Sequence, residues 1–460
     1  TGSYCNVGGV AGYWEGNVKT CSNSGKVHIA TSEENTAACC TRPAVGGVCA
    51  SVLFSAENCH NTGAVSIDRG VFAAGTDGNA LAGGYYQVSI GGVFGQIGIR
   101  ILDSNNYIKD CHNGGKVSLN LYMKQAGGTR SCTAGVAGYC SVIATNCYNV
   151  GPVDANVGNK IGNVGGVFGI IKASMTDCYN NATVTVNSRW EEADPTHANA
   201  FGNQFYIGGV YGYVDNAATN DCTFTNIENR SNGTVAYHKG WNNTVYSYIG
   251  GVGGAYNKGY ILNGAKNEGK VIVDCPNAMV IGGVTSTINS KIANATNNGE
   301  IKVTKATATQ YDKCTCVGGI TGYFNALVEN CTSNGSISVS DVQVADTCKV
   351  HIAGIMAQAG DANFVDTEEV KTAPKGNVVA CAITADASTT RVGAVFGQYR
   401  YSPTDPSKGT VYSIDLGTAD SPIVVKSTAK INGATPTAAN ICAHPSGNGH
   451  NVNTTNVKFE

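Results

Sequence analysis

Residues 45–65 read VGGVCASVLFSAENCHNTGAV, and the phrases at the two ends of this stretch recur along most of the chain. Copies of the first phrase, Val45-Gly46-Gly47-Val48, place their first small residue at positions 8, 46, 91, 134, 165, 208, 250, 282, 318, 353 and 393. These eleven copies span 385 residues in ten intervals, so the mean period is 38.5 residues. A period of this length predicts a solenoid, a propeller or an array of small units.

The second phrase, Cys-x-Asn-x-Gly-x-Val, follows the first at a nearly fixed distance. Its clear copies begin at Cys21, Cys59, Cys111 and Cys147, and its weaker copies begin at Cys178, Ala265, Ala295, Cys331 and Cys381. Apolar residues then alternate with a period of two, as in Val27-x-Ile29 and Val271-x-Val273, which is typical of strands. Because Asn and Gly tolerate a left-handed φ, the Asn-x-Gly step predicts a turn. Each unit is therefore expected to contain strand, turn, strand, turn, strand and a variable loop.

These patterns predict an all-β fold without sustained helices. We expect one elongated repeat solenoid, a right-handed parallel β-helix of about eleven coils over residues 1–400, followed by a divergent C-terminal cap over residues 401–460. The segment Tyr401-Ser-Pro403-Thr-Asp-Pro406 breaks the repeat and marks the boundary. A propeller is the alternative architecture, but eleven units exceed the usual four to eight blades.

Composition narrows the class of protein further. The 460 residues include 60 Gly and only 13% charged residues, against roughly 7% Gly and 25% charged residues in average proteins. The glycines lack a Gly-X-Y period, which excludes collagen, and 42% hydrophobic content is enough for a core. The net charge of −2 argues against nucleic acid as a partner. The sequence contains no run of 18 apolar residues, so a membrane-spanning segment is not predicted.

The 19 cysteines fall into two groups. We expect one group to form a structural ladder on successive coils: Cys21, Cys59, Cys111, Cys147, Cys178, Cys331 and Cys381. Ala265 and Ala295 take the same place in other units, which favours a small buried apolar slot. In-register strands lie about 4.8 Å apart, beyond the usual Cβ separation of a disulfide. The other group includes Cys39-Cys40 and Cys314-x-Cys316. For these cysteines the sequence does not decide between free thiols and a disulfide bond, and no spacing indicates a metal site.

The two phrases together resemble the GLUG repeat of bacterial surface proteins. The closest matches to the family pattern are Asn146-Cys147-Tyr148-Asn149 and Asp177-Cys178-Tyr179-Asn180, and the resemblance covers roughly residues 4–400. It implies a β-solenoid stalk of a secreted or cell-surface protein, adhesins of Bacteroidota included. Such repeats also accompany a protease that cleaves immunoglobulin A, but its catalytic His-Glu-x-x-His does not occur here. The chain departs from the family in its longer units and its many cysteines.

Catalysis is not expected, and neither is a cofactor. The acidic clusters are Glu33-Glu34, Glu191-Glu192-x-Asp194 and Asp366-x-Glu368-Glu369, all in or near the variable loops. Solvated loops explain these clusters, although carbohydrate-active β-helix enzymes do use paired carboxylates. No motif places a histidine beside a serine or cysteine nucleophile, and Cys442-x-His444 is expected to belong to a polar tail rather than a metal site.

Aromatic residues in the longest loops are the candidates for ligand binding. They are Tyr85, Tyr86, Trp190, Phe205, Tyr206 and Trp241. Insertions in solenoids often gather on one binding face, where aromatic side chains stack on sugars or anchor a protein. The competing interpretation is that these rings cover the hydrophobic shoulder of the solenoid.

We therefore expect an extracellular structural or adhesive repeat protein, displayed on a cell surface or assembled into a filament. The alternative is a carbohydrate-binding or carbohydrate-active β-helix protein. The expected partners are a glycan, a host or cell-surface protein, or another copy that associates through the solenoid ends, because the first phrase begins almost at Thr1.

Overall fold

The fold was analysed in a computed structural model. It describes residues 4–30, 42–71, 86–98, 105–122, 129–158, 161–188, 204–215, 222–238, 247–256, 260–275, 279–288, 291–310, 313–324, 327–345, 348–359, 374–400, 413–446 and 451–460.

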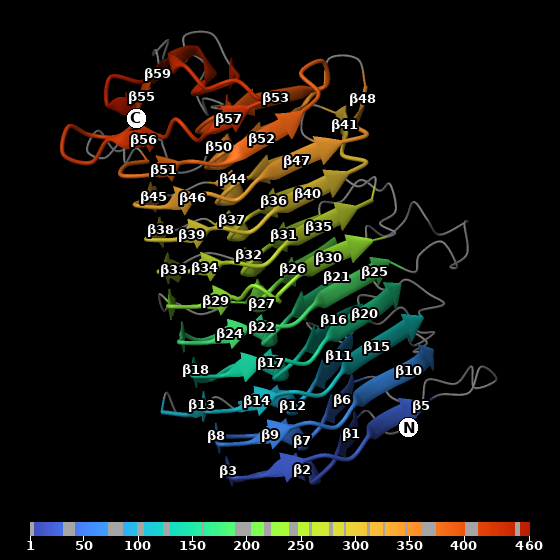
Figure 1. The fold of residues 1–460 in the computed structure, drawn as a ribbon. Helices are drawn as coiled ribbons and strands as arrows, with labels where there is room; N and C mark the ends of the chain where they lie inside the picture. The colour runs from blue at the N-terminus through green and yellow to red at the C-terminus, as the bar shows by residue number, and fades with distance from the viewer. Residues whose placement is uncertain are drawn as a thin grey trace, which may run out of the picture.

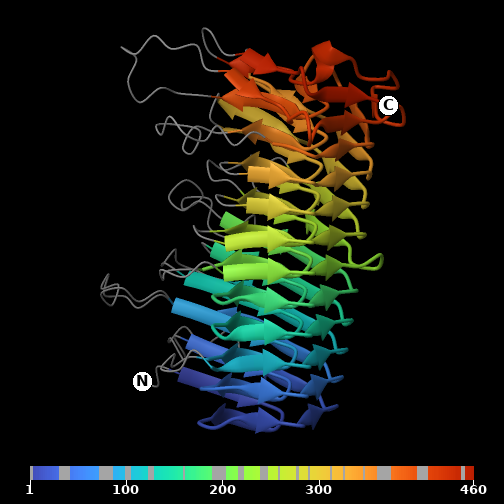
Figure 2. The ribbon, with the colours of Figure 1, turned by 90° about the vertical axis from the view of Figure 1, so that its left-hand side faces the viewer.

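The chain winds into a right-handed parallel β-helix, as the repeat predicts. Its colours rise from blue to red along one rod, with the two ends of the chain at opposite ends (Figures 1 and 2). Five parallel sheets of 11, 12, 9, 12 and 11 strands run along the rod, and each coil contributes its strands to them in this order. We call them the first to fifth sheets. The eleven strands of the first sheet correspond to the eleven copies of the first phrase.

The first sheet contains β1 (Tyr4–Gly8), β6 (Arg42–Gly46), β11 (Tyr86–Gly91), β16 (Thr129–Ala134), β21 (Ile161–Gly165), β26 (Gln204–Gly208), β31 (Ser247–Gly250), β36 (Met279–Gly282), β43 (Cys316–Gly318), β49 (Val350–Ala353) and β53 (Thr390–Gly393). The second contains β2 (Ala11–Trp14), β7 (Cys49–Val52), β12 (Phe94–Ile97), β17 (Ala137–Cys140), β22 (Phe168–Ile171), β27 (Tyr211–Val214), β32 (Gly253–Tyr256), β37 (Thr285–Ile288), β44 (Thr321–Phe324), β50 (Met356–Ala359), β54 (Phe396–Arg400) and β58 (Pro445–Ser446).

The third sheet contains β3 (Val18–Lys19), β8 (Ala56–Glu57), β13 (Tyr107–Lys109), β18 (Ile143–Thr145), β23 (Met175–Thr176), β28 (Cys222–Thr225), β33 (Tyr260–Asn263), β38 (Lys291–Ala293) and β45 (Leu327–Glu329). The fourth contains β4 (Ser22–Asn23), β9 (His60–Asn61), β14 (His112–Asn113), β19 (Tyr148–Asn149), β24 (Tyr179–Asn180), β29 (Glu228–Asn229), β34 (Lys266–Asn267), β39 (Thr296–Asn297), β46 (Thr332–Ser333), β51 (Val378–Val379), β56 (Ile423–Val425) and β60 (Val457–Phe459).

The fifth sheet contains β5 (Val27–Ala30), β10 (Val65–Val71), β15 (Val117–Tyr122), β20 (Val153–Gly158), β25 (Val184–Ser188), β30 (Val235–His238), β35 (Val271–Asp274), β40 (Ile301–Thr304), β47 (Ile337–Ser340), β52 (Ala382–Ala385) and β57 (Lys430–Ile431). Two small sheets contain β41 (Thr307–Gln310), β42 (Lys313–Cys314) and β48 (Gln343–Val344), and β55 (Ser413–Asp415) with β59 (Asn451–Asn453). A short 3-10 helix, η4, spans Ala438–Asn440. Residues of the expected cap thus extend three of the long sheets through β56, β57, β58 and β60.

Most coils contain five strands rather than the expected three, and one of the additional breaks follows from a single backbone feature. The residue before the Cys position adopts a left-handed conformation in most coils, for example Asn58 (φ 53°), Asn146 (φ 50°) and Asp177 (φ 53°). This residue separates the third-sheet strand from the two-residue fourth-sheet strand. Asn and Asp are enriched in this conformation because their short polar side chains form local hydrogen bonds. Where the coil lacks such a residue, Gly264 takes the position with φ 69°.

The Asn-x-Gly step was wrongly interpreted as a left-handed turn. Neither Asn149 nor Gly151 is among the described residues with positive φ. A Cβ on Gly151 would instead lie 2.1 Å from the carbonyl oxygen of Gly115 in the preceding coil. Close packing of successive coils therefore favours glycine at this position, although Ala182 takes it in the next coil.

One asparagine ladder, buried from its second member onward, joins the first eight coils. Its members are Asn23, Asn61, Asn113, Asn149, Asn180, Asn229, Asn267 and Asn297. Each Nδ2 donates to the Oδ1 of the next member, at 2.9 Å from Asn113 to Asn149 and 2.9 Å from Asn149 to Asn180. Within its own coil, Asn149 also donates to the Gly151 carbonyl at 2.7 Å. The buried amides therefore satisfy one another along the rod.

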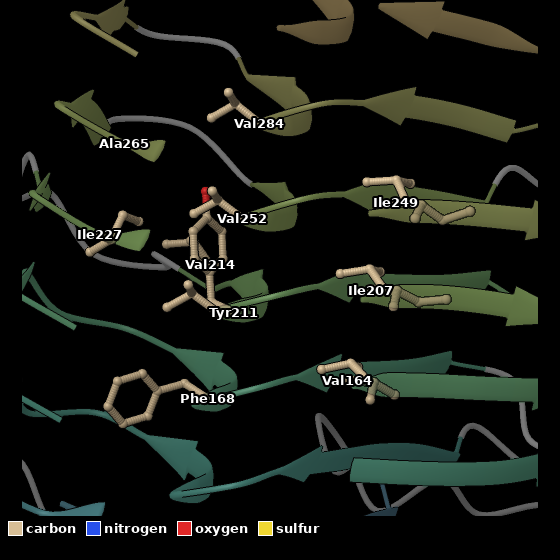
Figure 3. Close-up of a cluster of buried hydrophobic side chains, with 14 of the residues drawn as sticks. Val164, Phe168, Ile207, Tyr211, Val214, Ile227, Ile249, Val252, Ala265 and Val284 are labelled. Carbon is tan, nitrogen blue, oxygen red and sulfur yellow. The ribbon is translucent and has the colours of Figure 1, made fainter. Parts of the chain in front are cut away.

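The asparagine ladder explains why the two phrases occur together. A Cβ on Gly166, the second glycine of its pair, would lie 2.3 Å from Cγ of Asn180 in the same coil and 2.0 Å from the carbonyl oxygen of Gly209 in the next. The first phrase thus leaves the space that the asparagine of the second phrase fills. Val164, Phe168, Ile207, Tyr211, Val214 and their neighbours fill the rest of the interior (Figure 3).

Candidate functional site

The outward-facing side chains of the first and second sheets meet in a narrow angle. In β26, Phe205 and Ile207 point into the core, so Tyr206 faces the other way, and in β27 Tyr213 does the same. A Cβ on Gly212 would lie 2.6 Å from the backbone nitrogen of Val164, which shows that the two sheets nearly touch beside the glycine pair. We call the region where they diverge the wedge.

The wedge runs along the rod and is lined by side chains of both sheets, several of them half-buried. Its first-sheet wall contains Asn6, Ser89, Cys132, Asn163, Tyr206, Tyr248, Cys316 and His351, and its second-sheet wall contains Ser51, Gln96, Tyr139, Ile170, Tyr213, Tyr323, Gln358 and Gln398. Contacts cross it at several levels. The hydroxyl of Ser51 donates to Oδ1 of Asn6 at 3.0 Å, and the Tyr206 and Tyr213 ring centroids are 4.6 Å apart.

Three charged side chains gather in the wedge on three successive coils. Arg130 Nη1 and Lys172 Nζ lie 3.2 Å and 3.4 Å from the same oxygen, Oδ2 of Asp215. Their side chains are 16% (Arg130), 26% (Lys172) and 19% (Asp215) exposed, so this ion cluster is mostly shielded from water. Burial opposes the charge of Lys172, but Tyr139 and Asp215 outweigh it and raise the pKa of Lys172.

Tyrosines surround the charged cluster. The guanidinium carbon of Arg130 lies 5.0 Å from the Tyr213 ring centroid, and Lys172 Nζ lies 5.5 Å from that of Tyr139, which places both in range of cation–π attraction. The ring of Tyr206 also stacks on Tyr248 at 5.3 Å. Burial raises the pKa of Tyr139, Tyr206 and Tyr248, so these phenols stay protonated and remain hydrogen-bond donors.

The predicted binding aromatics do not form one group. Tyr206 lies in the wedge, half-buried. Phe205 was wrongly assigned to a binding surface, because it is fully buried in the core with its ring 5.5 Å from that of Tyr237. The backbone of Tyr86 belongs to β11, and its side chain is outside the described part, as are Tyr85, Trp190 and Trp241.

Sequence reasoning missed Arg130, Lys172 and Asp215. The signal was present for the neighbouring tyrosines: two residues after the end of the first phrase many units carry a further glycine, and the residue after it is tyrosine in four units, at Tyr13, Tyr139, Tyr213 and Tyr323. Aligning the units at this glycine would have placed these tyrosines on one line. The charged residues occur once each, so no repeat pattern marks them.

Six of the predicted ladder cysteines lie in register. Cys21, Cys59, Cys111, Cys147, Cys178 and Cys331 precede the fourth-sheet strands, and the same slot holds Ile227, Ala265 and Ala295. Their Sγ atoms contact backbone carbonyls two residues earlier, as in Cys111 to Lys109 at 3.2 Å. None of the cysteines in the described ranges forms a disulfide bond. Burial raises the pKa of Cys331 to about 12, so this thiol is not activated as a nucleophile.

Cys381 was wrongly placed on this ladder. The register pairs Val378 with Thr332 and Ile383 with Ile337, so Asn377 takes the position of Cys331, and Cys381 aligns with Gly335. The Asn377 amide fills the slot differently, since its Oδ1 accepts from the Cys331 N–H at 2.8 Å. Burial raises the pKa of Cys381 to about 11.

A second ladder runs on the outside of the fourth sheet. The rings of His60, His112, Tyr148 and Tyr179 stack with centroid separations of 5.1, 4.7 and 4.8 Å, and the Arg230 guanidinium covers the last ring at 3.4 Å. Each ring between His60 and Arg230 covers the face of the next. This arrangement reinforces coil stacking.

Within the described ranges, no group of three or more His, Cys, Asp or Glu side chains is arranged to hold a metal ion. The acidic clusters at residues 33–34, 191–194 and 366–369 lie outside these ranges. No helix within them is long and apolar enough to cross a membrane. Cys314 and Cys316 are neighbours, with their Sγ atoms 3.9 Å apart.

Comparisons with family models, curated proteins and solved structures return no match to this chain.

Proposed function

We propose that this chain is a non-enzymatic extracellular structural repeat protein of the GLUG type, an adhesive rod displayed on a cell surface or built into a filament. The observation that carries the proposal is the asparagine ladder, which joins eight coils by side-chain hydrogen bonds of 2.8–3.0 Å. Such an interior couples each coil to its neighbours and suits a stiff spacer. The predominance of structural ladders supports a mechanical role over a catalytic one.

Electron microscopy of material from the natural source tests this proposal. A free rod, a stalk on cells or a segment of a polymer would each support a structural role, and an intracellular location would contradict it. A turnover assay on a glycan panel tests the absence of catalysis. Activity that is lost in the triple variant Glu191→Gln, Glu192→Gln, Asp194→Asn would replace the structural proposal with a carbohydrate-active enzyme.

Self-association is a further part of the proposal, because the coils of this solenoid pair edge to edge in parallel sheets and such edges favour pairing with another chain. Light scattering should reveal oligomers that grow with concentration, and a strict monomer at high concentration would contradict this part.

The second candidate function is carbohydrate binding, and the wedge favours it. Tyr139, Tyr206, Tyr213 and Tyr248 combine half-buried rings with phenol donors, a combination common at recognition sites. A panel of immobilised glycans would test it with wild type and Tyr213→Ala. Binding that the variant loses at unchanged melting temperature would support the candidate.

A further inference from the structure

We propose that the wedge binds a carboxylate-bearing sugar chain, with Lys172 and Arg130 holding the carboxylate and the adjacent tyrosines contacting the sugar. The inference rests on the carbohydrate-binding candidate and specifies its ligand class. It comes from one juxtaposition, in which two cations share a single carboxylate between tyrosine rings.

The charge balance of the cluster favours an anion. Arg130 and Lys172 carry two positive charges, and Asp215 supplies one negative charge to both. Within the described ranges, Nε of Arg130 is buried and has no hydrogen-bond partner. A guanidinium has five N–H donors, and a shielded cation attracts a ligand more strongly than one in open water. A carboxylate beside the two cations would neutralise the excess charge and accept from the partly exposed Lys172.

The tyrosines indicate a sugar chain rather than a small acid. Tyr139 belongs to β17 and Tyr213 to β27, two coils further along, while Tyr206 and Tyr248 belong to successive coils of the first sheet. Rings and phenol donors are thus distributed along the axis of the rod. An extended ligand that runs across successive coils would meet several of them, whereas a single small anion would meet only the charged cluster.

An acidic peptide fits the wedge less well. Extended peptides usually bind by adding a strand to an open sheet edge. Here β22 is paired on one side with β17 and on the other with β27, and β21 is paired with β16 and β26. The backbone groups at this level are therefore already used, and a ligand must be recognised by side chains.

Asp215 gives the proposal a signature that a purely structural ion pair would not show. In the free protein this carboxylate occupies both cations and competes with the ligand. Asp215→Asn keeps the shape of the side chain, raises the cluster charge from +1 to +2 and should tighten binding. Lys172→Met lowers the cluster charge to zero and should weaken it.

The experiment is calorimetry on the full chain at low salt with oligogalacturonate, with its methyl ester and with a neutral glucan. We expect wild type to bind the free acid about tenfold more tightly than the ester. Lys172→Met should weaken binding of the acid by about tenfold, and Asp215→Asn should tighten it severalfold. Lys270→Met is the matched control, since Lys270 pairs with Glu300 at 3.1 Å away from the wedge, and it should bind like wild type.

Melting temperatures identify any variant that fails to fold. If Asp215→Asn fails to fold, Lys172→Met alone tests the inference, because replacing a partly exposed lysine disturbs the structure less. Absence of acid binding, equal affinity for acid and ester, or an unchanged Lys172→Met would overturn the inference. Binding of all sugars regardless of charge would overturn it while leaving the carbohydrate-binding candidate standing. Tighter binding of polyglutamate than of any uronate would show that the wedge recognises an acidic peptide, which also overturns it.

Discussion

Coils one to eight and coils nine to eleven share a backbone but differ at one interior position of the fourth sheet. The first eight coils hold asparagine there, ending at Asn297, and the next three hold Ser333, Val379 and Val425. The first phrase changes later than the ladder, since the second glycine of the pair persists at Gly319 and Gly354, opposite Ser333 and Val379, and becomes Ala394 only in the eleventh coil. A parallel β-helix thus accepts either a polar or an apolar ladder, provided that the facing residue leaves the matching space.

The glycine that faces the asparagine should be the most sensitive position. Gly166→Ala places a Cβ 2.0 Å from a backbone oxygen and 2.3 Å from Asn180 Cγ, and neither can move without shifting a coil. We expect a loss of about 4 kcal/mol or more in unfolding free energy, or failure to fold. Denaturation monitored by circular dichroism measures it. Ala394→Gly in the eleventh coil is the control and should cost about 1 kcal/mol at most, and equal losses would refute the pairing of glycine with asparagine.

Removing one amide from the middle of the ladder should have the next largest effect. Asn149→Ala deletes the bonds to Gly151 and Asn180 and removes one of the two acceptors of the Asn113 amide. Unsatisfied buried groups of this kind predict a loss of about 2–4 kcal/mol. Asn297→Ala, at the end of the ladder, should lose about half as much, because no further asparagine accepts from it. A larger loss at Asn297 than at Asn149 would show that the amides act independently.

Extending the ladder should stabilise the ninth coil. Ser333 is fully buried, and its hydroxyl has no partner within the described ranges. Ser333→Asn gives Asn297 Nδ2 an acceptor of the kind used in the first eight coils, so we expect a gain of about 1 kcal/mol in unfolding free energy. Ser333→Ala is the matched control and should be close to neutral. A destabilised Ser333→Asn would show that the ninth coil has already changed its spacing.

The comparison also shows how far sequence reasoning reaches. Repetition fixed the number of coils because Gly46, Gly91 and their equivalents must lie in register for the sheets to stack. The left-handed residue had a signal that was not used, because Asn, Asp or Gly directly precedes the cysteine slot in most units, as at Asn58, Asp110 and Gly264. Cys381 was misplaced because the tenth coil puts Asn377 in the cysteine slot and so shifts the apparent motif by four residues. The ion cluster of Arg130 and Asp215 was missed because the two residues lie 85 positions apart, and neither has an equivalent charged residue that recurs in the other repeat units.

The ring ladder on the outside of the fourth sheet should have the smallest effect on stability, and this effect should depend on pH. Burial and the neighbouring His60 lower the pKa of His112 below its ordinary value of 6.5. The folded state therefore binds fewer protons than the unfolded state in this range, so the contribution of His112 to stability is full above pH 6.5 and declines as pH falls through the folded pKa. The denaturation midpoint should fall slightly over this window in wild type. His112→Tyr, which copies Tyr148 of the next coil, should remove the decline and keep the stack. An identical pH profile in the variant would place the sensitivity elsewhere and leave the outer ladder without influence on coil stability.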